Sequence, residues 1–323
     1  MAVPPINPRL HVVTGKGGTG KTTVAGALAV GLAGRRQRVL LIEVEGRQGL
    51  AQLFDTPPLP YAETRLTATR GGEVVGLAVD TEAAMLEYLD LFYSIKRAGS
   101  MLRKMGAIDF ATTIAPGLRD VLLTGKVKEA VTRTGPSGRP AFDAVVLDAP
   151  PTGRIAAFLE ATQEVAGLTK MGPIHRQSIG VMELLRSART AVHIVTLLEE
   201  MPVQETLDAA AELRSAGYRI GQVIVNRARP ELVGAAAPDA GTLAEGLAAV
   251  GLSAELAPGL MVEMLDYGAR QQVQTRAAAE LSTMGVPLRR LPELAPPVDL
   301  GSLFELADAL ELDAWLGAGP VGA

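Results

Sequence analysis

The sequence of 323 residues contains no cysteine. This absence excludes disulfide bonds, iron–sulfur clusters and thiolate zinc sites within the chain. No uncharged apolar run approaches the roughly 18 residues that a membrane-spanning helix needs. The first ten residues, MAVPPINPRL, lack the apolar core of a secretion signal. We therefore expect a cytoplasmic protein with no transmembrane segment.

A strong excess of either charge is also missing. Charged residues make up 20% of the chain, apolar residues make up 48%, and the formal net charge is −4. This balance is typical of globular enzymes and differs from that of disordered or fibrous proteins. An acidic chain offers no electrostatic reason to bind a polyanion. We therefore expect no nucleic acid partner.

Short β-rich runs alternate with helical patterns, which is typical of parallel strands joined by crossover helices. We expect a helix over 22–33 and strands over 10–13, 39–42, 74–79, 142–148, 191–197, 222–226 and 287–291. Over about 81–130 and 155–190 the pattern becomes helical. The expected fold is a single α/β domain over 1–323. Its doubly wound, mostly parallel sheet carries a helical subdomain, formed by those two segments, inserted at one end, and 315–323 form a loose tail.

The stretch TGKGGTGKTT, Thr14 to Thr23, fits the phosphate-loop pattern G-x-x-x-x-G-K-[ST] and lies between an expected strand and an expected helix. Glycines there let backbone N–H groups surround phosphates, and the helix N-terminus adds its positive dipole end. Lys21 would neutralise the β and γ phosphates, and the Thr22 hydroxyl would bind Mg²⁺. The pattern predicts a site for ATP or ADP with Mg²⁺. The binding residues expected from this loop are Gly15, Gly17, Gly18, Thr19, Gly20, Lys21, Thr22 and Thr23.

A second metal ligand is expected at the end of a neighbouring buried strand, where Asp148 stands in AVVLDAPPTGR. The residues that follow it combine stiff prolines with a permissive glycine, which suits a switch segment that responds to the γ-phosphate. This expected switch comprises Pro151, Thr152, Gly153 and Arg154. A surface aspartate followed by an ordinary tight turn is the alternative.

The loop GKGGTGKTT resembles the deviant Walker A loop of an ATPase group. That group includes septum-site and partition ATPases, nitrogenase iron proteins, arsenite-pump ATPases and the targeting ATPases for tail-anchored membrane proteins. DAPPTGR is similar to the second switch of the last two, D-T-A-P-T-G-H, with Arg154 in place of the histidine. The chain most resembles the paired, single-cassette branch known from actinobacteria as anion-transporting ATPases. The resemblance runs from Leu10 to about Leu310 and implies a P-loop NTPase fold.

The resemblance also implies roles for particular residues. The first loop lysine, Lys16, would reach the nucleotide of a partner subunit, so that ATP clamps together a homodimer or a heterodimer with a paralogous ATPase. Asn226 would recognise adenine, and a loop around Leu291 and Pro292 would close over the base. For Asn226, a turn residue that ends a strand is the alternative.

One departure from the family pattern bears on catalysis. The family's second strand ends in S-T-D-P-A, and its aspartate positions the attacking water; here Glu45 takes that place with one methylene more. Positioning of water is sensitive to displacements near 1 Å, so Lys16, Lys21 and Glu45 would support only slow hydrolysis. The alternative for Glu45 is a solvated acid at a strand tip. Without cysteine, thiolate capture of arsenite and a zinc-clamped dimer are both excluded.

The helical segments contain a candidate binding groove for a client, that is, a protein whose helix the ATPase would bind. Apolar residues that recur at mostly helical spacings suit either a methionine-rich groove for a client helix or ordinary packing on the sheet. These residues are Met85, Leu86, Leu89, Phe92, Tyr93, Met101, Leu102 and Met105.

Three functions follow from these observations. The first is a dimeric, tail-anchor-targeting-like ATPase that controls binding of a protein or membrane-protein client. The second is a weakly hydrolysing regulatory or scaffold subunit that pairs with a paralogue. The third, a partition-type ATPase, is disfavoured by the acidic balance and the lack of a basic amphipathic C-terminal helix.

Overall fold

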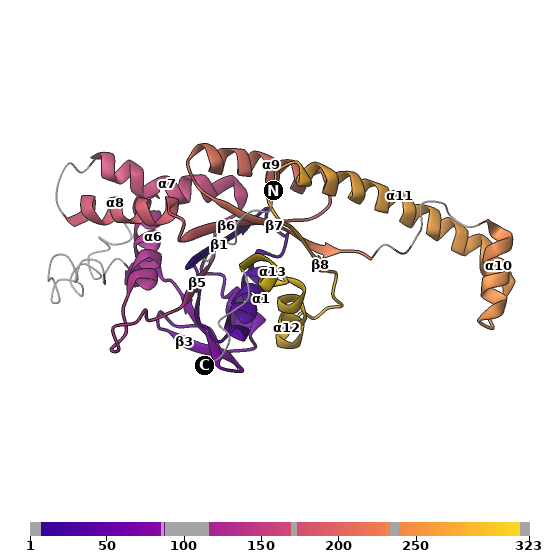
Figure 1. Cartoon of the computed structure of the whole chain (residues 1–323), viewed down its shortest axis with the longest axis horizontal. Helices are drawn as coiled ribbons and strands as arrows, with labels where there is room; N and C mark the ends of the chain where they lie inside the picture. The colour runs from indigo at the N-terminus through magenta and orange to yellow at the C-terminus, as the bar shows by residue number, and fades with distance from the viewer. Residues whose placement is uncertain are drawn as a thin grey trace.

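The computed structural model describes residues 8–84, 87, 116–168, 173–230, 232 and 239–316. Its centre is an eight-stranded sheet with the order β3-β4-β2-β5-β1-β6-β7-β8 (Figure 1). The strands are β1 (Leu10–Gly15), β2 (Arg38–Glu43), β3 (Thr64–Thr69), β4 (Gly72–Ala78), β5 (Ala144–Asp148), β6 (Thr190–Thr196), β7 (Ile220–Ala228) and β8 (Leu288–Pro292). All neighbouring pairs are parallel except β3 with β4. The predicted α/β fold with a mostly parallel sheet is therefore confirmed.

Helices cover both faces of this sheet. One face packs against α1 (Lys21–Gly34), α2 (Gly49–Leu53), α12 (Leu300–Ala309) and α13 (Leu312–Leu316). The other packs against α6 (Pro116–Thr132), α7 (Thr152–Leu168), α8 (Pro173–Arg186) and α9 (Glu200–Ser215). Side chains alternate between the faces: Val13 belongs to the first core and Val12 to the second. Because both faces of the sheet are buried, the sequences of the central strands are almost continuously apolar.

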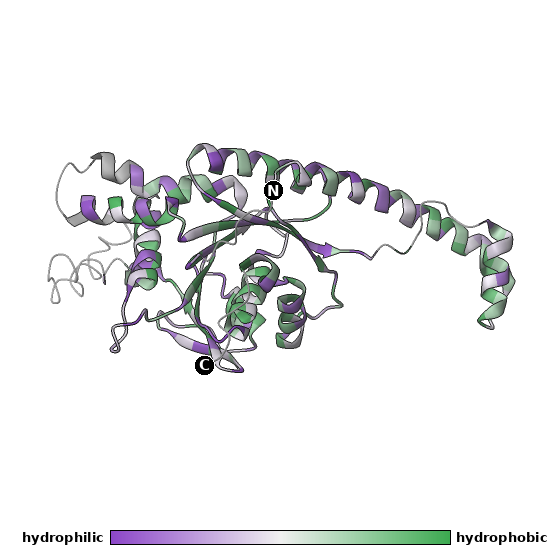
Figure 2. Ribbon diagram, in the orientation of Figure 1, coloured by the Kyte–Doolittle hydropathy of each residue, from purple (hydrophilic) through white to green (hydrophobic). Residues whose placement is uncertain are grey.

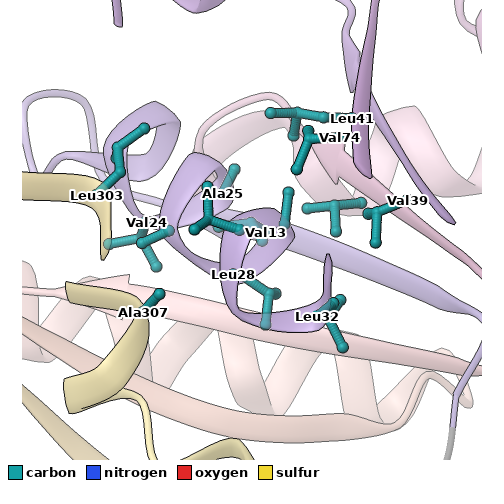
Figure 3. Packing of buried hydrophobic residues seen from close by; sticks show 14 of the residues in the cluster. Val13, Val24, Ala25, Leu28, Leu32, Val39, Leu41, Val74, Leu303 and Ala307 are labelled. Atoms are coloured by element: carbon teal, nitrogen blue, oxygen red, sulfur yellow. The ribbon is translucent and has the colours of Figure 1, made fainter. Parts of the chain in front are cut away.

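Helix α1 is buried because its sequence, KTTVAGALAVGLAG, is apolar on almost every side. Figure 3 shows Val24 and Leu28 of α1 between the strands and α12, with Leu303 of α12 close by. At Gly26, a Cβ atom would lie 2.7 Å from a methyl group of Leu53. The small residue Gly26 therefore lets α1 pack closely against α2.

The predicted strands all form, but two features of the chain differ from expectation. β3, an antiparallel edge strand, was not predicted, because its half-exposed sequence TRLTAT lacks a continuous apolar run. The loose tail predicted over 315–323 cannot begin at residue 315, because Trp315 and Leu316 are buried in α13. The apolar surface of these two side chains packs into the first core, which explains the correction.

A long helical arm is a further feature that the sequence pattern did not reveal. It consists of α10 (Ala240–Ala249), a 3₁₀ turn (Ala254–Leu256) and α11 (Ala257–Ser282), and it extends well away from the sheet (Figure 1). Only the C-terminal end of α11 joins a core cluster, through Ala277, Ala278 and Leu281. Apolar and polar residues both cover the arm, as Figure 2 shows.

Helices α6, α7 and α8 pack against one another beside the sheet, at the left of Figure 1. They fall within the two segments for which a helical layer is expected. The apolar residues of the candidate client groove, from Met85 to Met105, lie outside the described residues. The groove and the division into a sheet and a helical subdomain therefore stay predictions.

Candidate nucleotide site

The site forms where the parallel strands end. β2, β5, β1, β6 and β7 run in the same direction, so their carboxyl ends share one edge of the sheet. Asp148 at the end of β5 lies in register with Glu43 of β2 and Val13 of β1. The loop from Lys16 to Gly20 leaves β1 at this edge and leads directly into α1. The fold therefore gathers the predicted phosphate loop and the predicted metal ligand in one place.

Gly20 and Gly15 are the two loop glycines at which a side chain would collide with a neighbouring strand. Gly20 precedes α1 with a φ of +88°, and a Cβ atom there would lie 2.3 Å from the Asn226 side-chain nitrogen. A Cβ atom at Gly15 would lie 2.1 Å from the Val195 carbonyl oxygen. Both distances are far below van der Waals contact. The glycine spacing of the sequence thus matches close approaches by β6 and β7.

Asn226 stabilises the phosphate loop through a side-chain hydrogen bond. Its Nδ2 donates a hydrogen bond of 2.8 Å to the carbonyl oxygen of Thr19. The Thr19 hydroxyl in turn donates to the carbonyl oxygen of Lys16 at 2.9 Å. Asn226 and Thr19 are both buried. Besides its predicted contact with the base, Asn226 therefore shapes the phosphate loop, a role that the sequence did not indicate.

Thr22 and Asp148 meet at the expected metal position. The Thr22 hydroxyl donates a hydrogen bond of 2.7 Å to Asp148 Oδ2, while the buried Asp148 Oδ1 has no hydrogen-bond partner. Burial is the main cause that raises the pKa of Asp148 from 3.8 to about 6, and Glu43 and Glu45 act in the same direction, whereas Thr22 and Lys21 oppose it. A hydroxyl and an unpaired carboxylate oxygen are ligands that Mg²⁺ prefers. These residues therefore fit a divalent cation.

The two acids at the end of β2 differ in their surroundings. Glu43 is buried and its carboxylate accepts hydrogen bonds from the backbone N–H groups of Gly49, at 3.3 Å, and Leu50, at 3.0 Å. It therefore holds the start of α2. The Glu45 side chain is 20% exposed and lies 3.8 Å from the Arg47 guanidinium. Glu45 is thus the acid that remains accessible, and its catalytic role stays a prediction.

The two loop lysines also differ. Lys21 is buried at the start of α1, with 8% exposure. The Lys16 side chain is 32% exposed, and its Nζ lies 2.6 Å from Glu205 Oε1 of α9. The other carboxylate oxygen, Glu205 Oε2, accepts a hydrogen bond of 3.4 Å from the Thr152 hydroxyl. Glu205 was not predicted as a site residue, because nothing in the α9 sequence distinguishes it from the other acids of that helix.

The expected switch segment connects β5 to α7 and lies beside the loop. The Thr14 hydroxyl donates to the Pro150 carbonyl oxygen at 2.7 Å, which joins the end of β1 to this segment. Thr152 begins α7, and the Arg154 guanidinium lies 3.8 Å from Asp120 of α6. Pro151 and Gly153 complete the segment. The segment therefore contacts both the strand that leads into the phosphate loop and a helix beside the sheet.

A cavity of about 250 Å³ lies next to the loop, in the expected position for the base. Its lining includes Gly20, Thr23, Asn226 and Pro292. Leu291 and Pro292 are the last two residues of β8; the Leu291 side chain is fully buried in the core, whereas Pro292 lines the cavity. The closing of a loop around these residues over the base stays a prediction.

The profile of a family described as anion-transporting ATPase matches residues 9–188, more than half of the chain. The chain belongs to the anion-transporting ATPase family. ATPase BagA of Mycobacterium tuberculosis is 54% identical over 314 residues, which cover 94% of this chain and 92% of BagA. The family assignment that the sequence predicted is thereby confirmed.

More distant relatives match shorter parts. The arsenical pump-driving ATPase of Acidiphilium multivorum is 25% identical over 68% of this chain and 39% of its own length. ATPase get3 of Schizosaccharomyces japonicus is 28% identical over 53% of this chain and 51% of its own. Family membership implies that this ATPase binds ATP. Among the described residues, no helix has the length and apolar character needed to cross a membrane.

Proposed function

We propose that this family member is a dimeric Mg²⁺-dependent ATPase that hydrolyses ATP slowly and whose opening and closing controls binding of a protein client. The observation that carries the proposal is the pair formed by Thr22 and Asp148 at the head of α1, with an unpaired buried carboxylate oxygen. A turn that bound phosphate without a metal ion would not need the Asp148 carboxylate beside it.

In this proposal, Thr22 and Asp148 hold Mg²⁺, which neutralises charge on the bound phosphates. Lys21 and the N-terminus of α1 bind the same phosphates, and Gly15 to Gly20 wrap around them. Asn226 and Pro292 contact the base from the adjoining cavity. Each of these groups comes from a rigid strand end or helix start, which favours accurate positioning of the γ-phosphate.

The exposure of Lys16 supports the dimer. Lys21 already provides a buried cation for the bound nucleotide, whereas the Lys16 side chain is open to solvent on one side. An exposed second lysine in the loop can reach a nucleotide held by another subunit. That subunit can be a second copy of this chain or a paralogous ATPase. With no cysteine in the chain, nucleotide and packing would hold the two subunits together.

We propose that Glu45 positions the attacking water. It is the accessible acid at the end of β2, since Glu43 is engaged by the backbone of α2. Its additional methylene makes the position of the carboxylate less restricted than that of an aspartate. Slow turnover follows from this.

The client function rests on the coupling between the switch segment and the helices beside the sheet. Arg154 of the switch segment contacts α6, and Thr152 begins α7. Motion of this segment on hydrolysis would displace the proposed helical layer, to which a protein or membrane-protein client would bind. One distant relative is an arsenical pump-driving ATPase, but this chain has no cysteine thiolate with which to capture arsenite.

The second candidate is a regulatory subunit that binds ATP and depends on a paralogue for turnover. The replacement of an aspartate by Glu45 favours it. In this case the chain would contribute Lys16 to the paralogue's nucleotide while its own site turned over little or not at all.

ATP hydrolysis and molecular mass, measured together, test both candidates. Wild type, Lys16→Ala and Glu45→Gln are compared with Mg²⁺ and either ATP or ADP. We expect the wild type to dimerise with ATP and turn over slowly, and both substitutions to abolish hydrolysis. A wild type that binds ATP yet stays monomeric and inactive would favour the regulatory subunit.

A further inference from the structure

One carboxylate connects two parts of the proposed nucleotide site that lie far apart in the sequence. Glu205 Oε1 lies 2.6 Å from Lys16 Nζ, and Glu205 Oε2 accepts the Thr152 hydroxyl at 3.4 Å. Lys16 belongs to the phosphate loop, and Thr152 belongs to the switch segment. Glu205 therefore couples the positions of the lysine and the switch within a single subunit.

The negative charge of Glu205 limits the roles that this side chain can have beside a phosphate loop. A carboxylate beside a phosphate loop repels the nucleotide, so it does not serve to bind phosphate. Its two oxygens instead match one cation and one hydroxyl donor. Other acids of α9, Glu200 and Glu212, are exposed, whereas Glu205 is half-buried against the loop. Glu205 thus has the features of a counter-ion for Lys16.

We propose that Glu205 is a positioning residue that holds Lys16 within its own subunit until nucleotide moves the switch segment. This inference rests on the proposed function, in which Lys16 reaches the partner's nucleotide. When Thr152 moves, Glu205 loses its second hydrogen bond and its carboxylate is less restricted. Lys16 then exchanges Glu205 for the phosphates across the dimer interface.

The strength of the Lys16–Glu205 ion pair depends on how far the two side chains are exposed to solvent. Lys16 and Glu205 side chains are 32% and 36% exposed, so solvent screens their attraction. Such pairs change an equilibrium by about two- to fivefold. Glu205 would therefore bias the position of Lys16 and would not block dimerisation. Its loss should make ATP-driven dimerisation easier by about that factor.

Two measurements on the full-length chain test the inference, with Glu205→Gln as the variant. Glutamine keeps the size of the side chain and removes its charge. Glu212→Gln, on the exposed side of the same helix, is the matched control. The first measurement is the rate at which an amine-acylating reagent labels Lys16 in the nucleotide-free monomer, read by mass spectrometry with the other lysines as internal references. The second is the dimer dissociation constant with Mg²⁺ and ATP.

We expect Glu205→Gln to speed labelling of Lys16 and to tighten the ATP-bound dimer about two- to fivefold, while Glu212→Gln changes neither. In a Lys16→Ala background, Glu205→Gln should leave the dimer constant unchanged, which a merely structural role would not produce. Unchanged labelling and dimerisation in Glu205→Gln would overturn the inference. Faster labelling with an unchanged dimer constant would also overturn it, since the contact would then not control assembly.

Failure of the proposed function gives a different pattern. If wild type and Lys16→Ala dimerise equally with ATP, or neither dimerises, Lys16 has no role in a partner's site. The inference then fails with the proposed function, whatever the labelling rates. If dimerisation depends on Lys16 but not on Glu205, the proposed function stands and only the inference is rejected.

Discussion

The Thr22 hydroxyl donates a hydrogen bond of 2.7 Å to Asp148, and this contact joins the first turn of α1 to the end of β5. The buried Asp148 carboxyl has no positive partner in ion-pair contact with it among the described residues. Burial therefore disfavours its ionised form and is the main cause that raises the pKa of Asp148 from 3.8 to about 6. The ionised Asp148 carboxyl thus lowers the stability of the protein at neutral pH, and the divalent cation that we propose for this site would offset that cost.

Asp148→Asn should stabilise the protein in the absence of metal and nucleotide. Because the folded-state pKa of Asp148 lies above its usual value, its contribution to stability is fully present below about pH 4 and is lost as the pH rises through about 6. At pH 7 the variant should be more stable by about 2–3 kcal/mol, and the difference should vanish near pH 4. Chemical denaturation with a chelator, from pH 4 to 8, measures this. Hydrolysis of Mg²⁺-ATP by the variant should be lost, and equal stability of both proteins at pH 7 would contradict the assignment.

Thr22→Val should weaken binding of Mg²⁺-ATP at least tenfold and should also remove the dependence of binding on Mg²⁺. Valine keeps the shape of threonine but has no hydroxyl to bind metal or to donate to Asp148. Calorimetric titration of ATP with Mg²⁺, and with chelator instead, measures both effects. An affinity equal to that of the wild type in Mg²⁺ would exclude Thr22 as a metal ligand.

Gly20→Ala and Asn226→Ala should show non-additive effects on stability. Gly20→Ala places a methyl group against the Asn226 amide and strains a backbone with a φ of +88°, a cost of about 1–3 kcal/mol. Asn226→Ala leaves the buried Thr19 carbonyl oxygen without its donor, at about 1–3 kcal/mol. In the double variant the steric contact disappears, so its destabilisation should be smaller than the sum. Unfolding free energies of the four proteins give the coupling, and strictly additive values would show that the two residues do not touch.

Glu45→Asp should increase the rate of ATP hydrolysis several-fold, and Glu45→Gln should abolish it. The shorter side chain restricts the carboxylate to a smaller range of positions, which favours in-line water attack. Glutamine has no negative charge with which to orient the water. Steady-state phosphate release measures the rates, and Arg47→Gln serves as a control for the nearby cation. An unchanged rate in Glu45→Gln would reject a catalytic role and leave Glu45 as a solvated acid.

Much of the site follows from short stretches of sequence. The phosphate loop is contiguous and its spacing is a recognised pattern, so Gly20 could be proposed as a loop residue before the fold was known. Asp148 could be assigned because a buried strand that ends in an acid places that acid at the carboxyl edge of a parallel sheet. The resemblance did not show that the Leu291 side chain packs in the core while Pro292 lines the cavity, because the two residues are neighbours at the end of one strand.

The sequence by itself determined the mostly parallel α/β fold, the phosphate-loop pattern and the family, since each depends on residues close together in the chain or on an apolar periodicity. Only the tertiary structure decided that Glu205 meets Lys16 and Thr152, that Asn226 supports Thr19, and that α11 extends from the body as an arm. These relationships join distant segments through single side-chain contacts. Such contacts depend on how helices pack on the sheet, and packing leaves no local pattern in the order of the amino acids.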